Sequence, residues 1–316
     1  MSMVDLWHLV LIVTSVFYSI LIGANASYAM AASFGSRAMS KVKILFLLSI
    51  SLFLGAMTAS ENVVETIAGG VCFIPGDVTV AYVILVSALF CVLMANIFKI
   101  PLSTSEVTVG AVVGACLYLC ASFSLNLFFI VFSWIILSLL AFILSYFISK
   151  GAGDKNLKES SVTRILLILV GCFVAFSIGA NNVANSIGPI LNTEILTLRG
   201  SLLVGAIPMA IGALLFGGRV MGNVGSNIIR LNSYDALIIS LIAGIIIFVA
   251  SILGIPMPVA QIFTLSIVGV RYAKPEMSVP MSNKIVEEML IFWVISPIVS
   301  LVVSFSAIFI LYKFFI

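Results

Sequence analysis

Asparagine side chains follow a Gly-Ala pair at two places in otherwise apolar sequence. The first run, at 23–25, ends in Asn25, and the second, which begins at 179, contains Asn181, Asn182 and Asn185. An amide inside a bilayer needs hydrogen-bond partners that lipid cannot supply, and such residues usually serve a function. Asn181 and Asn185 are four positions apart and share one face of a helix. We therefore expect these four amides to bind a polar substrate inside the membrane.

A second candidate site follows Pro101. Ser103 can cap a helix that starts within the membrane, and Glu106, three positions on, completes a capping box. The free N–H groups at such a helix start carry partial positive charge, and the hydroxyls of Thr104 and Ser105 add further donors. This combination is typical of an anion site that needs no lysine. We expect Ser103, Thr104 and Ser105 to bind the substrate.

Glu106 is an acidic residue within an apolar segment, where the usual role of a carboxyl group is to transfer protons during transport. Burial favours its neutral form, which can donate to an anion, whereas the ionised form repels one. In the second half, Gln261 puts an amide at the matching position after another proline break, so we assign Glu106 and Gln261 to the coupling ion. The simpler alternative is that Glu106 only caps its own helix.

Composition excludes several other classes of protein. The 316 residues are 62% hydrophobic and 9% charged, whereas soluble domains carry roughly 25% charged residues. The net charge of +3, with its basic residues in short loops, gives no nucleic-acid surface. The five cysteines have neither zinc nor redox spacing, and Cys116 and Cys120 are expected only to pack. No metal site and no cofactor are expected, apart from a coupling H+ or Na+.

An enzyme embedded in the membrane is a weaker alternative. It would need paired carboxylates, a serine–histidine pair or metal ligands. The adjacent Glu287 and Glu288 lie at a helix entry, and His8 is remote from any motif serine. A passive channel is also weaker, because a channel seldom needs two broken helices at matching places. A carrier is therefore expected.

Ten apolar segments must position these motifs, five in each half, and each is close to the length that crosses a bilayer. The linker at 150–164 is rich in glycine, serine and charge, and it separates an N-terminal membrane repeat (1–149) from a C-terminal one (165–316). The segments are 7–33, 44–59, 78–98, 102–120, 127–148, 165–190, 200–216, 234–254, 257–270 and 286–314.

The two halves repeat one pattern. The Gly-Ala-Asn runs are 156 positions apart (179 − 23), and the proline breaks at Pro101 and Pro256 are 155 apart (256 − 101). With the N-terminus outside, thirteen of the 15 lysines and arginines fall on inner loops, including the linker, which is then cytoplasmic. Five segments per half make the second repeat enter from the opposite side. We therefore predict an all-α polytopic membrane protein of two inverted repeats, with 10–12 crossings and broken helices around a central site.

One alternative is that the Gly-Ala-Asn runs only pack helices together, with asparagine as a link between them. The second copy at a matching place argues for a site. At these residues the chain resembles the inorganic phosphate transporter (PiT) family over nearly its full length. The family carries a repeated Gly-Ala-Asn-Asp-Val-Ala-Asn-Ala signature, which residues 179–186 follow closely and residues 23–27 follow in more degraded form.

The resemblance implies a symporter of a tetrahedral oxyanion in the cell membrane, coupled to sodium or protons. The signature aspartate is Ala26 in the first copy and Asn182 in the second. In sodium-coupled members that aspartate is associated with the cation, so proton coupling is favoured here. Residues 101–114 and 256–261 look most like the sulfate-permease branch, so sulfate is favoured over phosphate. Membrane lipids are the other expected partners, and a homodimer is left open.

Overall fold

The computed structural model describes residues 3–30, 39–74, 76–98, 102–153, 160–228, 233–274 and 283–314. These residues are almost entirely helical, with one isolated β-bridge between Cys72 and Phe123. A helix satisfies its own backbone hydrogen bonds, which is what long runs of leucine, isoleucine, valine and phenylalanine require inside a bilayer. The predicted all-α membrane fold is confirmed.

The first half contains α1 (Met3–Asn25), η1 (Ala26–Met30), α3 (Lys41–Thr58), α4 (Glu61–Glu65), η2 (Thr66–Gly70), α5 (Val78–Phe98), α6 (Thr104–Tyr118) and α7 (Leu125–Ala152). The second half contains α8 (Ser161–Asn182), α9 (Ala184–Leu191), α10 (Leu198–Ile228), α11 (Ser233–Ile252), α12 (Val259–Ala273) and α13 (Asn283–Phe314).

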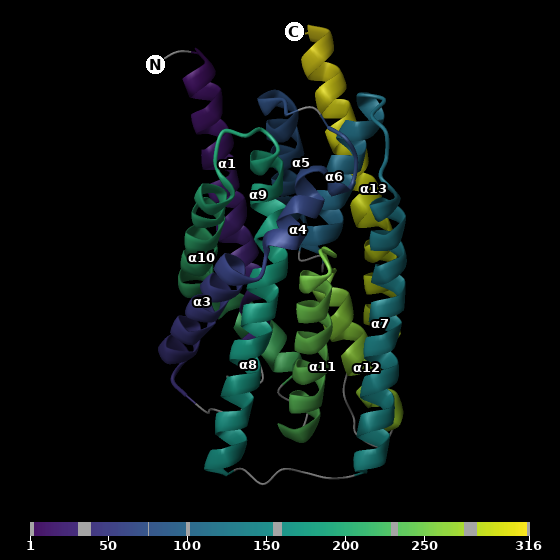
Figure 1. Cartoon of the computed structure of the whole chain (residues 1–316). Helices are drawn as coiled ribbons and strands as arrows, with labels where there is room; N and C mark the ends of the chain where they lie inside the picture. Colours follow the sequence, from purple (N-terminus) through teal and green to yellow (C-terminus); the bar gives the residue numbers. More distant parts are fainter. Residues whose placement is uncertain are drawn as a thin grey trace.

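Eight segments among the described residues are long and apolar enough to cross a membrane. The protein is therefore a multi-pass membrane protein. Together with these eight, the helices α6 and α12 account for the ten expected apolar segments. Each of the two has 15 residues and is about 22 Å long, less than the ~30 Å of a bilayer core. In Figure 1, α5 and α6 lie in the upper half of the bundle, and α11 and α12 lie in the lower half. The start of α1 and the end of α13 lie at the top, and the end of α7 and the start of α8 lie at the bottom.

Helix packing between the halves is reciprocal. α1 packs against α10 as α8 packs against α3, and α6 packs against α13 as α12 packs against α7. Glycines allow the first set to approach closely: a Cβ on Gly23 would meet the backbone of Met209, and one on Gly179 would meet the backbone of Leu52. Equivalent helices therefore use equivalent glycines, as expected of two related halves.

The Gly-Ala-Asn runs do interrupt their helices. α1 ends at Asn25, and the chain continues as the tighter helix η1. α8 ends at Asn182, and a single residue, Val183, separates it from α9. The interruption at Val183 is slight, because this residue keeps a helical φ of −59° and ψ of −32°. The regular α-helix is therefore interrupted at each motif without a long unwound loop.

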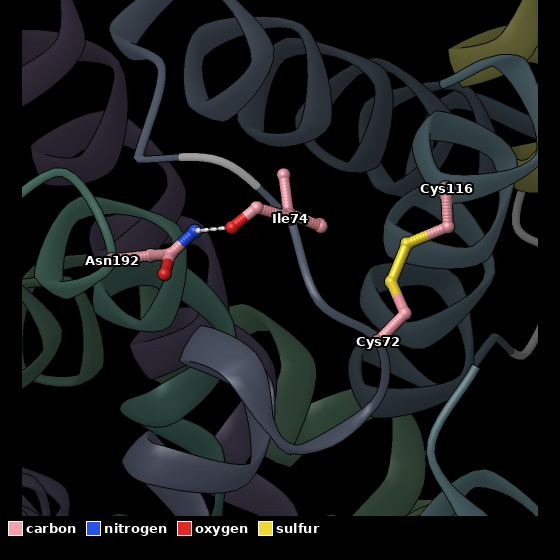
Figure 2. The surroundings of a disulfide bond; sticks show 4 residues. All are labelled: Cys72, Ile74, Cys116 and Asn192. Carbon is pink, nitrogen blue, oxygen red and sulfur yellow. Dashed lines mark hydrogen bonds between the residues drawn. A yellow bond between two sulfur atoms is a disulfide. The ribbon is translucent and has the colours of Figure 1, made fainter. Parts of the chain in front are cut away.

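The sequence predicted that Cys116 only packs in the core. In the structure Cys116 forms a disulfide with Cys72, across a Cα–Cα distance of 6.6 Å (Figure 2). The prediction was wrong because the partner is 44 positions away, between η2 and α5, where spacing along the chain gives no signal. Two residues on, the Ile74 carbonyl accepts a hydrogen bond from Asn192 Nδ2 at 3.3 Å (Figure 2). This segment therefore ties the end of α6 to the end of α9.

Candidate functional site

The N-terminus of α6 lies inside the bundle. Ser103 is its N-cap, and Ser103 Oγ accepts a hydrogen bond from Glu106 N at 3.5 Å. Ser103, Thr104 and Ser105 are all buried, at 5%, 7% and 0% exposure. The predicted helix start is therefore present, with its hydroxyls enclosed by protein.

The Glu106 carboxyl group bonds to side chains of α12 and α13, and within the described residues it makes no capping bond to its own helix. Gln261 Nε2 donates to Glu106 Oε1, and Ser296 Oγ donates to Glu106 Oε2 at 3.4 Å. On the other side of the pair, Ser138 Oγ donates to Gln261 Oε1 at 3.4 Å. Glu106 is 1% exposed and Gln261 is 6% exposed, and Glu106 has no ion pair within the described residues. The two predicted coupling residues therefore lie in contact, at the first turns of α6 and α12.

Asn185 joins the second asparagine motif to α6. Its Nδ2 donates to Thr104 Oγ1 at 3.3 Å and to Ser105 Oγ at 3.2 Å. Its Oδ1 is buried and has no hydrogen-bond partner within the parts of the chain that the structure describes. Two first-half hydroxyls and a second-half amide therefore meet at this point.

Asn181 has a different environment. Its Nδ2 donates to Ser251 Oγ at 3.0 Å and to the Ile255 carbonyl at 2.9 Å, and its Oδ1 accepts from Met257 N at 2.7 Å. All three partners belong to the end of α11 and the turn before α12. Asn181 therefore fixes the shape of this turn, and its amide is fully used by the protein.

A small cavity of about 40 Å³ lies between the two motifs. Its polar lining comes from Asn25, Ser103, Thr104 and Asn182, and its apolar lining from Ile22, Ala26, Leu102, Val259 and Ala260. Asn182 is 6% exposed, and its Oδ1 has no hydrogen-bond partner within the described parts of the chain. A buried amide without a partner indicates a position for a ligand or water. The lining carries hydrogen-bond donors and no charged side chain.

Several residues that support this site were missed from the sequence. Tyr18 OH hydrogen-bonds Thr108 Oγ1 at 2.8 Å on α6, and Ser19 Oγ donates to Ser186 Oγ at 2.7 Å on α9. Ser138 and Ser296, which contact the Glu106–Gln261 pair, were also missed. Serine is common in membrane helices, so single serines give no signal, although the repeat of serine every fourth position in α13 could have drawn attention.

The fold, with long apolar helices around an enclosed polar site, is that of a membrane transport protein. The sequence profile of the phosphate transporter family matches the chain twice, at residues 22–152 and 148–304. The chain belongs to this family of anion transporters, whose members are permeases and not enzymes.

Relatives and a solved structure agree with that assignment. The chain is 36% identical to the sulfate permease CysP of Bacillus subtilis, over 94% of this chain and 86% of the relative. It is 27% identical to a phosphate permease predicted for Methanocaldococcus jannaschii, over 93% of this chain and 94% of that protein. The fold matches a solved sodium-dependent phosphate transporter with a TM-score of 0.85 at 20% identity, over 98% of this chain and 99% of the other.

Proposed function

We propose that the protein carries sulfate across the cell membrane together with protons. The observation that carries the proposal is the cavity at the start of α6, where Ser103, Thr104, Asn25 and Asn182 offer neutral donors. Sulfate at neutral pH bears no proton, so it needs only donors. The carboxyl group of Glu106, on the first turn of the same helix, is absent from the cavity lining and accepts hydrogen bonds from Gln261 and Ser296.

Proton coupling is inferred from the surroundings of Glu106. A buried carboxylate without an opposite charge is costly, so its neutral form is favoured. Taking up a proton beside the anion site lowers the repulsion of an incoming dianion, and releasing the proton raises it again. The positions that hold the family's signature aspartate are Ala26 and Asn182, which offer no charge to sodium. The B. subtilis relative named as a sulfate permease supports the same cargo.

Phosphate is the second candidate, coupled to sodium or protons. The unpartnered Asn182 Oδ1 favours it, because protonated phosphate needs an acceptor that sulfate does not. The two relatives named for phosphate point the same way. The amide of Asn182 can present either end to the cavity, so this observation does not exclude sulfate.

The test is uptake of radiolabelled sulfate and phosphate by the purified protein in proteoliposomes, each with and without sodium and a proton gradient. We expect the rate of sulfate uptake to increase with the proton gradient and to be independent of sodium. Sodium-dependent phosphate uptake without a sulfate signal would establish the second candidate instead. Counterflow separates a carrier from a channel, because only a carrier is stimulated by substrate on the far side.

A further inference from the structure

Two rows of buried serines lead away from the Glu106–Gln261 pair. The first row, on α13, consists of Ser296, Ser300 and Ser304, spaced four positions apart and so on one helix face. Ser296 donates to Glu106 and Ser300 Oγ donates to the Val107 carbonyl at 2.7 Å, so this face lies against α6. We call these three residues the α6–α13 seam.

The second row, on α7, consists of Ser138, Ser145 and Ser149, at spacings of seven and four that also keep one face. Ser138 donates to Gln261, and Ser145 lies against Gly269 of α12, so this face packs on α12. Ser266 of α12 is three positions before Gly269 and lies on the same side. We call these four serines the α7–α12 seam. The two seams occupy equivalent helix interfaces in the two halves.

Most of these hydroxyls lack the partner that a membrane serine normally has. A serine in a membrane helix usually donates to the carbonyl four positions earlier, as Ser49 does to Leu45 at 2.8 Å. Four seam hydroxyls have no partner within the described residues, and all four side chains are 0% exposed: Ser145, Ser149, Ser266 and Ser304. The only other serine of this kind in the described parts of the chain is Ser201, on α10. Internal water binds at buried hydroxyls without partners wherever the helix interface leaves room for it.

The seams point to opposite sides of the membrane. Ser304 lies about 12 Å along α13 from Ser296, toward the end of the bundle that carries both termini (Figure 1). Ser149 lies about 16 Å along α7 from Ser138, toward the opposite end (Figure 1). Together with the central pair, the two rows therefore extend across most of the bilayer core.

Few other groups near the α6–α13 seam can titrate. Tyr18 of α1 is bonded to Thr108, Cys91 of α5 lies beside Ser300, and Tyr312 of α13 donates to Asp77 Oδ2 at 3.1 Å near the outer end. At the inner end of the α7–α12 seam, Lys150 Nζ donates to Tyr146 OH at 3.0 Å. Arg271 and Tyr272 lie at the same end, on α12, and Lys274 directly after α12 pairs there with the buried Asp235 of α11 at 2.8 Å. Glu106 is therefore the central carboxyl group between the two rows.

We propose that the two seams hold water and form the route by which protons reach Glu106 from one membrane face and leave it toward the other. This inference rests on the proposed proton coupling. A proton arriving on water in the α6–α13 seam converts the Glu106 carboxylate to the acid. The acid then gives that proton to water on the side of the α7–α12 seam, which restores the carboxylate. The anion cavity contains no seam residue, so anion and proton take separate paths.

The test compares Ser304→Ala and Ser145→Ala with Ser49→Ala in proteoliposomes that contain a pH-sensitive dye. The first two changes remove an unpartnered hydroxyl from each seam, and the third removes a hydroxyl that is bonded to its own helix. We expect sulfate-driven proton entry to fall several-fold in both seam variants and to stay unchanged in Ser49→Ala. Sulfate counterflow at equal pH on both sides needs no net proton movement, so it should keep the wild-type rate in all three.

Counterflow also reports whether each variant is folded. Where Ser145→Ala loses it, Ser149→Ala replaces it as the variant of the same seam. Unchanged proton entry in a variant of either seam that keeps counterflow overturns the inference. A parallel fall of proton entry and counterflow in both Ser145→Ala and Ser149→Ala also overturns it. A wild-type protein that exchanges sulfate without moving protons also overturns it and leaves anion transport standing. A wild-type protein that exchanges neither sulfate nor phosphate refutes the proposed function itself.

Discussion

Gln261 on α12 donates a hydrogen bond to Glu106 on α6, so the first turns of two helices from opposite halves meet inside the membrane. The two residues are 155 positions apart, which is the spacing of the repeat at the proline breaks. Two carboxylates at this distance would repel each other, whereas a carboxyl and an amide attract. The difference between the halves at this one position therefore lets a single proton change the charge at the centre of the protein.

Glu106→Gln is expected to uncouple transport from the proton gradient. The amide keeps the shape of the carboxyl group and can still hydrogen-bond Gln261, but it cannot take up a proton. If one proton accompanies each sulfate, a gradient of one pH unit supports up to about tenfold accumulation, because ~1.4 kcal/mol corresponds to a factor of ten. Uptake measured against imposed pH gradients should lose this dependence while counterflow persists. Glu61→Gln, the same change at an exposed position, is the control. Uptake by Glu106→Gln that still follows the gradient would assign coupling to another group.

Gly179→Ala and Gly23→Ala are expected to destabilise the protein. The added methyl group would collide with the backbone of Leu52 or Met209, which cannot move aside as a flexible side chain can. Overpacking of this kind typically costs about 1–3 kcal/mol. Thermal unfolding of the purified protein in detergent measures the loss. Gly151→Ala in α7 is the matched control, because no atom lies within 4 Å of the added methyl group. Equal melting temperatures for all three variants would refute close packing at the repeated glycines.

The outline of this fold could be predicted from the sequence because its signals are local. Apolar runs predicted the ten helical segments, and the motifs at Gly23 and Gly179 predicted where two α-helices are interrupted. At the site, Ser103 was recognised as a cap and Glu106 as a buried carboxyl group from their spacing alone. These features depend on neighbours within a few positions along the chain.

The remaining features depend on which helices meet, and a single sequence does not show that. Asn181 and Asn182 are adjacent and were assigned one role, yet one amide holds the turn before α12 and the other lines the cavity. The bond between Cys72 and Cys116 depends on how the η2–α5 segment folds back on α6. The segments that form α6 and α12 were also expected to cross the membrane. The structure shows that each helix has 15 residues, which is too short to cross alone.

Cys72→Ser is expected to lower stability without abolishing the site. A disulfide of this kind contributes about 2–4 kcal/mol, mainly by restricting the unfolded chain. Its position at the outer end, as assigned from the loop charges, is the oxidising side on which disulfides persist. Melting temperatures with and without a reducing agent measure the effect: reductant should lower the wild-type value and leave that of Cys72→Ser unchanged. Cys120→Ser is the control, since Cys120 is exposed and free. A wild-type melting temperature that is the same with and without reductant would contradict a structural role for the bond.

Asn181→Ala and Asn182→Ala are expected to fail in different ways, although the residues are neighbours. Asn181→Ala leaves the Met257 N–H and the Ile255 carbonyl without their partner in a buried turn, at about 1–3 kcal/mol for each lost bond. Its main effect should be a lower melting temperature. Asn182→Ala breaks no side-chain hydrogen bond within the described parts of the chain and should melt like the wild type. It removes an amide from the cavity, however, and should raise the sulfate concentration needed for half-maximal uptake. Asn182→Asp sharpens the contrast, because a carboxylate in the cavity repels a dianion, so sulfate uptake should fall further than in Asn182→Ala.

If Asn182→Ala transports normally while Asn181→Ala keeps its stability and loses transport, the anion lies at the α11–α12 turn and the assignment of the cavity is wrong.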